Sequence, residues 1–383
     1  MKIITPTVAA ELANEVYKVR HDKTLKGFLS NKIFTANPKN KTALKAEIGG
    51  RIINVSDGFA VCARGGKEHE TDLFLIFRGT DRAADYFTDA RIGVERSVTG
   101  IPVHMGFNQV FKSLLTQLRT FVTLNRTGIT RIICIGHSLG GAIATLAAEW
   151  VKSHTALTVQ LYTFGCPRVG FEFFSTTVTK KLRPAHIYRV YNESDPVPMV
   201  PVFPFTHAPT LPGQGYVVTS TGAMLSFSAH KMKTYIEMVK QHTWDKLKRP
   251  CPLSSSEQAI QRWLASDAPV SPLNPQTWAF INAGLQWVLQ SIMSGAIMVL
   301  QLSVMSLFTL ADKIAWILLK GIDLAKEASV WVLRLMRKIM QVLGMKIVKS
   351  VEQLTRSFMR AILERLMRKI TEEAARAVRG ISG

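Results

Sequence analysis

Apolar and polar positions along the first two thirds of the chain predict strands that alternate with helices. Four compact apolar runs have the length and composition of buried strands. They cover residues 72–79, 131–136, 157–165 and 185–192. Apolar residues have helical spacing over 106–124 and again from Leu139 onward. This order predicts an α/β fold with a central, mainly parallel sheet that is covered on both faces.

The apolar positions near the N-terminus also have helical spacing. Val8, Leu12 and Val16 fall on one face of an amphipathic helix. Glu11 interrupts the uncharged run that a general secretory signal peptide needs. We therefore expect a protein that is made in the cytoplasm without such a signal.

Changes of pattern divide the chain into three parts. An α/β domain is predicted over 1–245, and prolines interleaved with serines predict a linker over 246–275. The remainder, 276–383, is predicted to be all-helical, apolar at first and then basic. No Asp, Glu, Lys or Arg occurs between Ala268 and Ala311.

The uncharged run has two conflicting properties. It is longer than the ~20 apolar residues that cross a bilayer, yet polar residues recur at every fourth position and form a stripe along one helix face. The stripe consists of Asn282, Gln286, Gln290 and Ser294. Basic amphipathic segments follow from Asp312 onward. Three interpretations stay open: 276–383 spans a membrane, lies on an anionic membrane surface, or packs against the α/β domain.

The composition favours an anionic partner. The formal charge is +21, from 48 Lys and Arg against 27 Asp and Glu, which favours an anionic membrane surface, nucleic acid or an acidic protein. The alternative is a basic surface that only keeps the protein in solution. No basic run interleaved with aromatic residues occurs, so we do not expect nucleic-acid binding. The four cysteines form no CxxC pair, which argues against a disulfide framework or a zinc site, and we expect no metal.

A serine between two glycines follows one of the predicted strands. Ser138 lies between the strand at 131–136 and the helix from Leu139, and Gly136 and Gly140 leave space for a sharp turn. Such a turn exposes the hydroxyl at the edge of the sheet, where a nucleophile has room for its substrate. The alternative is that a small polar residue fills a tight turn.

A nucleophilic serine needs an acid and then a histidine later in the chain. The acids downstream are Glu149, Glu172, Glu193 and Asp195. Asp195 follows the strand at 185–192 and precedes PVP, which fixes it at a strand end, although an Asx turn gives the same pattern. For the base, His230 at the start of a helical segment and His207 in a proline-rich loop both stay open, and His242 lies close to the linker.

Attack on an ester creates an oxyanion that N–H donors must stabilise. The backbone N–H of Leu139, directly after the serine, is one expected donor. Thr80 is the other, because Gly79 lets the chain turn inward after the strand at 72–79. An ordinary turn at the end of a strand is the alternative for Thr80.

Six ordered motifs extend these single signals. They are FRGTDRAADYFTDA (77–90), VHMGFNQVF (103–111), IGHSLGGAIATLAA (135–148), YTFGCPRVG (162–170), NESDPVPMVP (192–201) and HKMKTY (230–235). Together they resemble the class 3 lipase family. The resemblance implies an α/β-hydrolase domain over 1–245, and a serine carboxylic-ester hydrolase without a cofactor that acts on acylglycerols or phospholipids.

The resemblance also implies a role at each matching position. Ser138 is the implied nucleophile, Asp195 the acid and His230 the base, with Thr80 and Leu139 as the oxyanion hole.

Two further histidines match positions of the family. His207 is implied to be structural or to contact the substrate, and His137 is expected to pack beside the nucleophile, with a substrate contact as its other role. The segment DRAADYF after Thr80 corresponds to the place where fungal members carry a lid.

Several stretches are most similar to one bacterial subgroup. They are ADYFTDARIG, SLGGAIATL, LYTFGCPRVG and PVPMVPVFPFTHAP, and they look like lipases that the type VI secretion system delivers as antibacterial effectors. This similarity implies export by that machinery, phospholipase A activity on the membranes of a target cell, and a cognate immunity protein as partner. The alternatives are a pore-forming protein that acts through its C-terminal helices and a neutral-lipid acylglycerol lipase.

Overall fold

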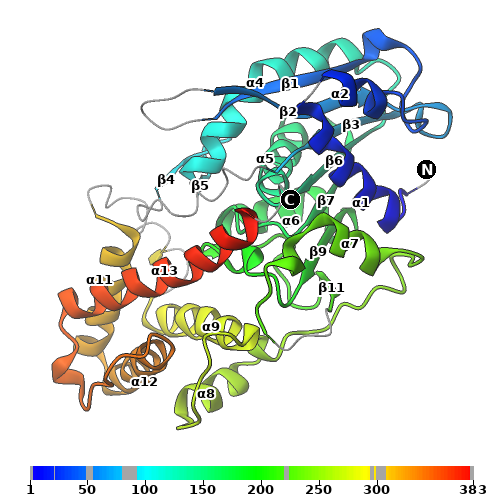
Figure 1. Cartoon of the computed structure of the whole chain (residues 1–383). Coiled ribbons are helices and arrows are strands. Elements are labelled where there is room, and N and C mark those ends of the chain that lie inside the picture. The colour runs from blue at the N-terminus through cyan, green and yellow to red at the C-terminus, as the bar shows by residue number, and fades with distance from the viewer. Residues whose placement is uncertain are drawn as a thin grey trace.

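A seven-stranded sheet forms the centre of the computed structural model (Figure 1). The structure describes residues 3–20, 22–48, 55–79, 93–219, 224–293, 297–298 and 308–379. The strand order is β1-β2-β3-β6-β7-β9-β11. The strands are β1 (Lys41–Ile48), β2 (Val55–Arg64), β3 (Asp72–Phe77), β6 (Arg131–His137), β7 (Thr158–Phe164), β9 (Ile187–Asn192) and β11 (Tyr216–Val218). Only β1 with β2 and β2 with β3 pair antiparallel among these neighbours, which confirms a mainly parallel sheet.

The four predicted strands correspond to β3, β6, β7 and β9, and their ends agree within two residues. The antiparallel strands β1 and β2 were not predicted. The sequence of β1, KTALKAEI, mixes charged and polar residues with small or apolar ones, so it lacks the continuous apolar run of a strand that is buried on both faces.

Helices cover both faces of the sheet, as predicted. They are α1 (Pro6–Glu15), α2 (Asp22–Leu29), α4 (Met105–Asn125), α5 (Leu139–His154), α6 (Glu172–Leu182) and α7 (Met232–Val239). Alternate residues of β3 supply the two cores, since Phe74 and Ile76 pack in the cluster with α1 and α7, whereas Leu75 and Phe77 pack with α4 and α5.

A second, four-stranded sheet flanks the first. Its order is β10-β8-β5-β4, and its strands are β4 (Val94–Arg96), β5 (Pro102–His104), β8 (Gly170–Phe171) and β10 (Phe205–Thr206).

The part of the chain after 245 is helical wherever it is regular and described. Its helices are α8 (Glu257–Ala265), α9 (Pro275–Ile292), α11 (Leu310–Leu324), α12 (Lys326–Val342) and α13 (Arg356–Arg379). Buried side chains of α9 and α11 to α13 belong to the same hydrophobic cluster as those of α4, α5 and β6. α8 lies within the predicted linker and packs on α9 and α12. The proposed boundaries at 245 and 275 stay predictions.

The polar stripe on α9 faces the α/β part of the molecule. Asn282 Oδ1 accepts a hydrogen bond from the backbone N–H of Phe203 at 2.7 Å, and Gln290 Nε2 donates to Glu172 Oε2 at 3.2 Å. Ser294 lies outside the described residues. Two of the four stripe residues therefore bond to the α/β part of the chain, which favours the third interpretation for α9.

Within the described ranges, no helix has both the length and the apolar character needed to cross a bilayer. The predicted uncharged run includes residues 294–296 and 299–307, which lie outside those ranges.

Candidate active site

Ser138 occupies a strained turn between a strand and a helix. β6 ends at His137 and α5 begins at Leu139, and Ser138 between them has φ 55° and ψ −130°. A positive φ is unfavourable for a residue with a side chain and is typical of functional turns. The geometry matches the strand–turn–helix setting of a nucleophile elbow.

Both glycines of the motif are required by close backbone contacts. A Cβ at Gly136 would lie 2.1 Å from the carbonyl oxygen of Gly140, and one at Gly140 would lie 2.2 Å from that of Phe77. A Cβ at Gly79 would lie 2.4 Å from the hydroxyl of Tyr17 and 3.2 Å from Cβ of Ser138. The turn and the end of β3 therefore meet without room for larger residues.

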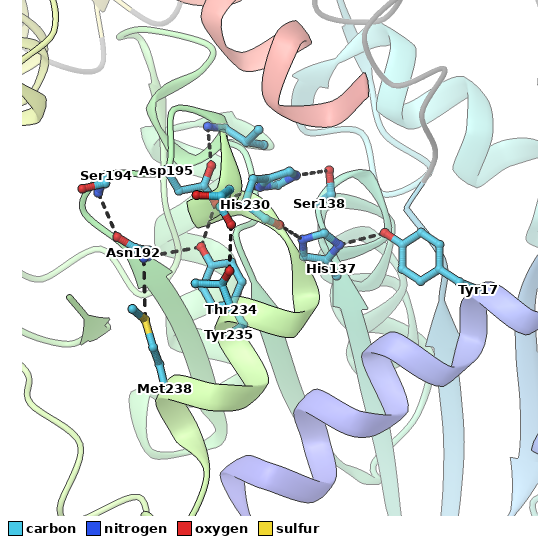
Figure 2. A network of polar contacts seen from close by, with 12 residues as sticks. Tyr17, His137, Ser138, Asn192, Ser194, Asp195, His230, Thr234, Tyr235 and Met238 are labelled. Atoms are coloured by element: carbon cyan, nitrogen blue, oxygen red, sulfur yellow. Dashed lines mark hydrogen bonds and ion pairs between the residues drawn. The ribbon is translucent and has the colours of Figure 1, made fainter. Parts of the chain in front are cut away.

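Three side chains from distant segments meet in one line of hydrogen bonds (Figure 2). His230 Nε2 lies 2.9 Å from Ser138 Oγ, and His230 Nδ1 lies 2.7 Å from Asp195 Oδ2. Asp195 follows β9, and His230 ends the short helix η6 (Ser228–His230) before α7. All three residues are 0% exposed, so the line is shielded from water.

The carboxylate of Asp195 has two further donors. The backbone N–H of Val197 bonds to Oδ1 at 2.9 Å, and the hydroxyl of Tyr235 bonds to Oδ2 at 2.7 Å. Burial, together with the charge of Asp195, raises the pKa of Tyr235 well above its ordinary value. The phenol therefore stays protonated and donates. These bonds fix the carboxylate in the orientation that faces His230.

The ring of His137 bonds to the backbone of His230 and to Tyr17. Its Nε2 lies 2.8 Å from the carbonyl oxygen of His230, and its Nδ1 lies 2.7 Å from the hydroxyl of Tyr17. Burial and the neighbouring His230 lower the pKa of His137 well below 6.5. A neutral imidazole carries one N–H, so Nε2 donates to the carbonyl and Nδ1 accepts from Tyr17.

His207 lies apart from this line and braces the loop after β9. Its Nε2 bonds to the carbonyl oxygen of Pro198 at 2.8 Å. Burial lowers the pKa of His207, and the charges of Arg189 and Arg168 lower it further. The carbonyl contact makes Nε2 the donor in the neutral ring. Substrate contacts by His137 or His207 stay predictions.

The other downstream candidates have different neighbours. Glu149 is buried beside Lys181, with Oε1 2.8 Å from the ammonium. Glu172 bonds to Gln290, and Glu193 is exposed. His242 is exposed and bonds to the carbonyl of Lys240. None of these bonds leads to Ser138.

Of the two expected oxyanion donors, one is described. Leu139 is the first residue of α5, so its backbone N–H has no acceptor within the helix. Thr80 and the segment DRAADYF lie outside the described residues, as does the lid expected there. Among the described residues, no cluster of three or more His, Cys, Asp or Glu could hold a metal ion.

A cavity lies beside Asp195. Its volume is about 710 Å³, and residues of the loop after β9 and of α9 line it. Apolar side chains such as Met199, Trp278 and Trp287 line it together with Arg168. Ser138 and His230 are not among the lining residues.

Two residues of the site were missed by the sequence reasoning. Tyr17 comes from the N-terminal segment, 120 positions before His137, and no local pattern signals this contact. Tyr235 lies on α7, five positions after His230, so its place on the helix that follows the candidate base was the available signal.

A family comparison agrees with the motifs. Residues 74–205 match the model described as "Lipase (class 3)". The secreted mono- and diacylglycerol lipase 1 of Fusarium solani is 32% identical over 145 residues, which cover 37% of this chain and 43% of that protein.

Two shorter matches come from other kinds of organism. Toxin TseL of Vibrio cholerae is 38% identical over 103 residues, which cover 27% of this chain and 15% of TseL. Phospholipase A1-IIbeta of Arabidopsis thaliana is 34% identical over 100 residues, which cover 24% of each protein. The chain thus spans less than half the length of these three relatives.

Among solved structures, the triacylglyceride lipase of Rhizomucor miehei aligns with a TM-score of 0.42 and 22% identity, over 56% of this chain and 78% of that one. Residues 74–205 are thus similar to the class 3 lipase family, and the remainder of the chain lies outside that match.

Proposed function

We propose that the protein is a phospholipase of the A type, in which Ser138, His230 and Asp195 form the catalytic triad. The family supports hydrolysis of carboxylic esters. The observation that carries the proposal is the line of hydrogen bonds from Ser138 Oγ through His230 to Asp195, 2.9 Å and 2.7 Å long.

The proposed reaction has two halves. Ser138 Oγ attacks the ester carbonyl carbon while His230 Nε2 takes the hydroxyl proton, and Asp195 stabilises the resulting imidazolium. The tetrahedral oxyanion is held by the N–H of Leu139 and by Thr80. Its collapse expels the lysophospholipid, which receives the proton from His230, and leaves an acyl-serine. Water, deprotonated by His230, then releases the fatty acid and restores Ser138.

The experiment for this proposal is fatty-acid release from vesicles of defined phospholipid. Ser138→Ala is expected to lose release by about 10³-fold or more. Ser30→Ala is the matched control, because Ser30 is an exposed serine at the end of α2. Equal release by the Ser138→Ala variant and the intact chain would overturn the proposal.

Two observations favour phospholipid over neutral glyceride as the substrate. The net charge of +21 favours an anionic lipid surface, and one relative is named as a phospholipase A1. The relative named as a mono- and diacylglycerol lipase favours the alternative. Parallel assays with phosphatidylglycerol, labelled separately at the two acyl positions, and with diacylglycerol distinguish the substrates.

We also propose that the protein acts as an antibacterial toxin exported by a type VI secretion system, with a cognate immunity protein. The support is the similarity to the relative named Toxin TseL. Directing the chain to the periplasm of a susceptible bacterium is expected to kill the cell, and Ser138→Ala is expected to abolish killing. Killing by both forms would overturn an enzymatic toxin.

A further inference from the structure

The three triad residues are closed off from solvent. Ser138, His230 and Asp195 are each 0% exposed. An ester carbonyl must come within about 3–3.5 Å of Ser138 Oγ to react. A lipid therefore reaches the serine only after a covering segment has moved.

The C-terminal helix packs on the segments that carry the triad. α13 contacts η5 (Val197–Met199), which begins two residues after Asp195, and η6, which ends at His230. In Figure 2 the faint red helix above Ser138 is α13. Thus one helix from the end of the chain lies over both the acid and the base.

One face of α13 is buried along its whole length. Its buried side chains are Met359, Ile362, Leu363, Leu366, Met367, Ile370, Thr371, Ala374, Ala375, Ala377 and Val378. Ala377 and Val378 in the last turn are 0% exposed, although helix ends ordinarily fray. The end of the helix is therefore held against the body of the protein.

The opposite face of α13 carries a line of cations. Arg365, Arg368, Arg376 and Arg379 are exposed and lie along one side of the helix, which they share with the exposed Glu372, so cations outnumber anions on this side. Arg376 lies 3.3 Å from Glu373 and is 58% exposed. A helix with one apolar and one basic face is suited to lie in the interface of an anionic bilayer.

We propose that α13 covers the Ser138 site in solution and is the segment that docks on an anionic bilayer, so that docking uncovers the site. In the structure the apolar face of α13 packs on α11 and α12 as well as on η5 and η6, and it cannot be buried there and in the bilayer interface at the same time. The membrane and the active site therefore compete for the same surface. This inference rests on the proposed function, since it concerns access to the proposed nucleophile.

The first test separates opening from lipid hydrolysis. The rate on a soluble ester, p-nitrophenyl butyrate, is measured with and without vesicles of ether-linked phosphatidylglycerol, which contain no cleavable acyl ester. We expect these vesicles to raise the rate about tenfold or more, and vesicles of ether-linked phosphatidylcholine to have much less effect. No stimulation, or equal stimulation by both lipids, would overturn the proposal.

Two triple variants test whether the exposed arginines of α13 bind the anionic vesicles. The triple variant Arg365→Gln, Arg368→Gln, Arg379→Gln is expected to bind anionic vesicles about a hundredfold more weakly and to lose the stimulation, expressed relative to its own rate without vesicles. The matched control Lys23→Gln, Lys26→Gln, Lys32→Gln removes the same charge from exposed lysines on and after α2. Loss of stimulation in both variants to the same extent contradicts a specific role for α13.

Hydrogen exchange provides a readout that needs no activity. Ether-linked phosphatidylglycerol vesicles are expected to speed exchange of the amides in η6, because these lose the cover of α13. If the ester is not hydrolysed but exchange is faster, the proposed function fails while the role of α13 stands. If vesicles bind and exchange in η6 is unchanged, the role of α13 fails, whatever the activity.

Discussion

Tyr235 donates its hydroxyl proton to the same carboxylate oxygen of Asp195 that bonds to His230, at 2.7 Å in each case. The oxygen Oδ2 is thus held from two sides, while the backbone N–H of Val197 holds Oδ1. The orientation of the carboxylate depends on a phenol that the sequence reasoning did not single out.

Tyr235→Phe is therefore expected to lower kcat about tenfold and to leave KM nearly unchanged. The variant removes a hydrogen bond to a buried charge, whose loss costs about 1.5–3 kcal/mol, but it removes no group that binds the ester. The measurement is a set of kcat and KM values on a soluble ester, together with urea unfolding. Tyr188→Phe is the control, because Tyr188 stacks on Tyr162 in the core; an equal fall in kcat there contradicts the prediction.

Local patterns indicated Ser138, Asp195 and the helical segment after His230, because each of these residues follows or precedes a regular element. The partners that support them were not predictable in this way. Tyr17 and His137 are 120 positions apart. Tyr17 lies in the short helix η1 (Val16–Arg20) directly after α1, and α1 packs on β6, which ends at His137. Such contacts follow from tertiary packing, which a single sequence does not encode locally.

The apolar run after Pro275 left three interpretations open for a similar reason. A helix buried among other helices and a helix in lipid both need apolar side chains around most of their surface. What distinguishes α9 is the partner of its polar stripe, since Asn282 bonds to the backbone of Phe203. That partner lies 79 positions away and could not be identified from the periodicity.

Gly140 is expected to be required for ester hydrolysis. In Gly140→Ala the new Cβ would lie 2.2 Å from the carbonyl oxygen of Phe77, so either β3 or the turn at Ser138 must shift. We expect ester hydrolysis to fall by about a hundredfold or more, because small displacements of a nucleophile have effects of this size. Kinetics on a soluble ester measure the loss.

Gly27→Ala is the matched control for this substitution. Gly27 lies in α2, and a Cβ there would have no neighbour within 4 Å. The variant is expected to keep its activity and to gain about 0.5–1 kcal/mol of unfolding free energy, since alanine is the better helix former. Equal activity of the Gly140→Ala and Gly27→Ala variants would refute the steric argument.

The contact between α9 and the α/β domain is expected to contribute to stability. Asn282→Leu removes the acceptor of the Phe203 N–H and leaves a part-buried donor unpaired, at a cost of about 1–3 kcal/mol. Urea unfolding followed by circular dichroism measures the change. Gln286→Leu, one turn further along the same stripe, changes a residue that lines the cavity and is expected to be nearly neutral; the same loss in both variants contradicts a specific bond.

The burial of His104 is expected to make the stability of the protein depend on pH. Burial lowers the pKa of His104 to about 3, while an unfolded histidine titrates near 6.5. Between these values the unfolded chain binds a proton that the folded chain does not, so this residue lowers the unfolding free energy as pH falls from about 6.5 towards 3. The contribution is about 1.4 kcal/mol for each pH unit.

His104→Phe, which keeps a ring beside Phe107, is therefore expected to reduce the slope of unfolding free energy against pH between 6 and 4 by about this amount. Urea unfolding at each pH gives the slope, and His242→Phe serves as control because His242 is exposed. An unchanged slope in His104→Phe would mean that His104 takes up its proton in the folded protein.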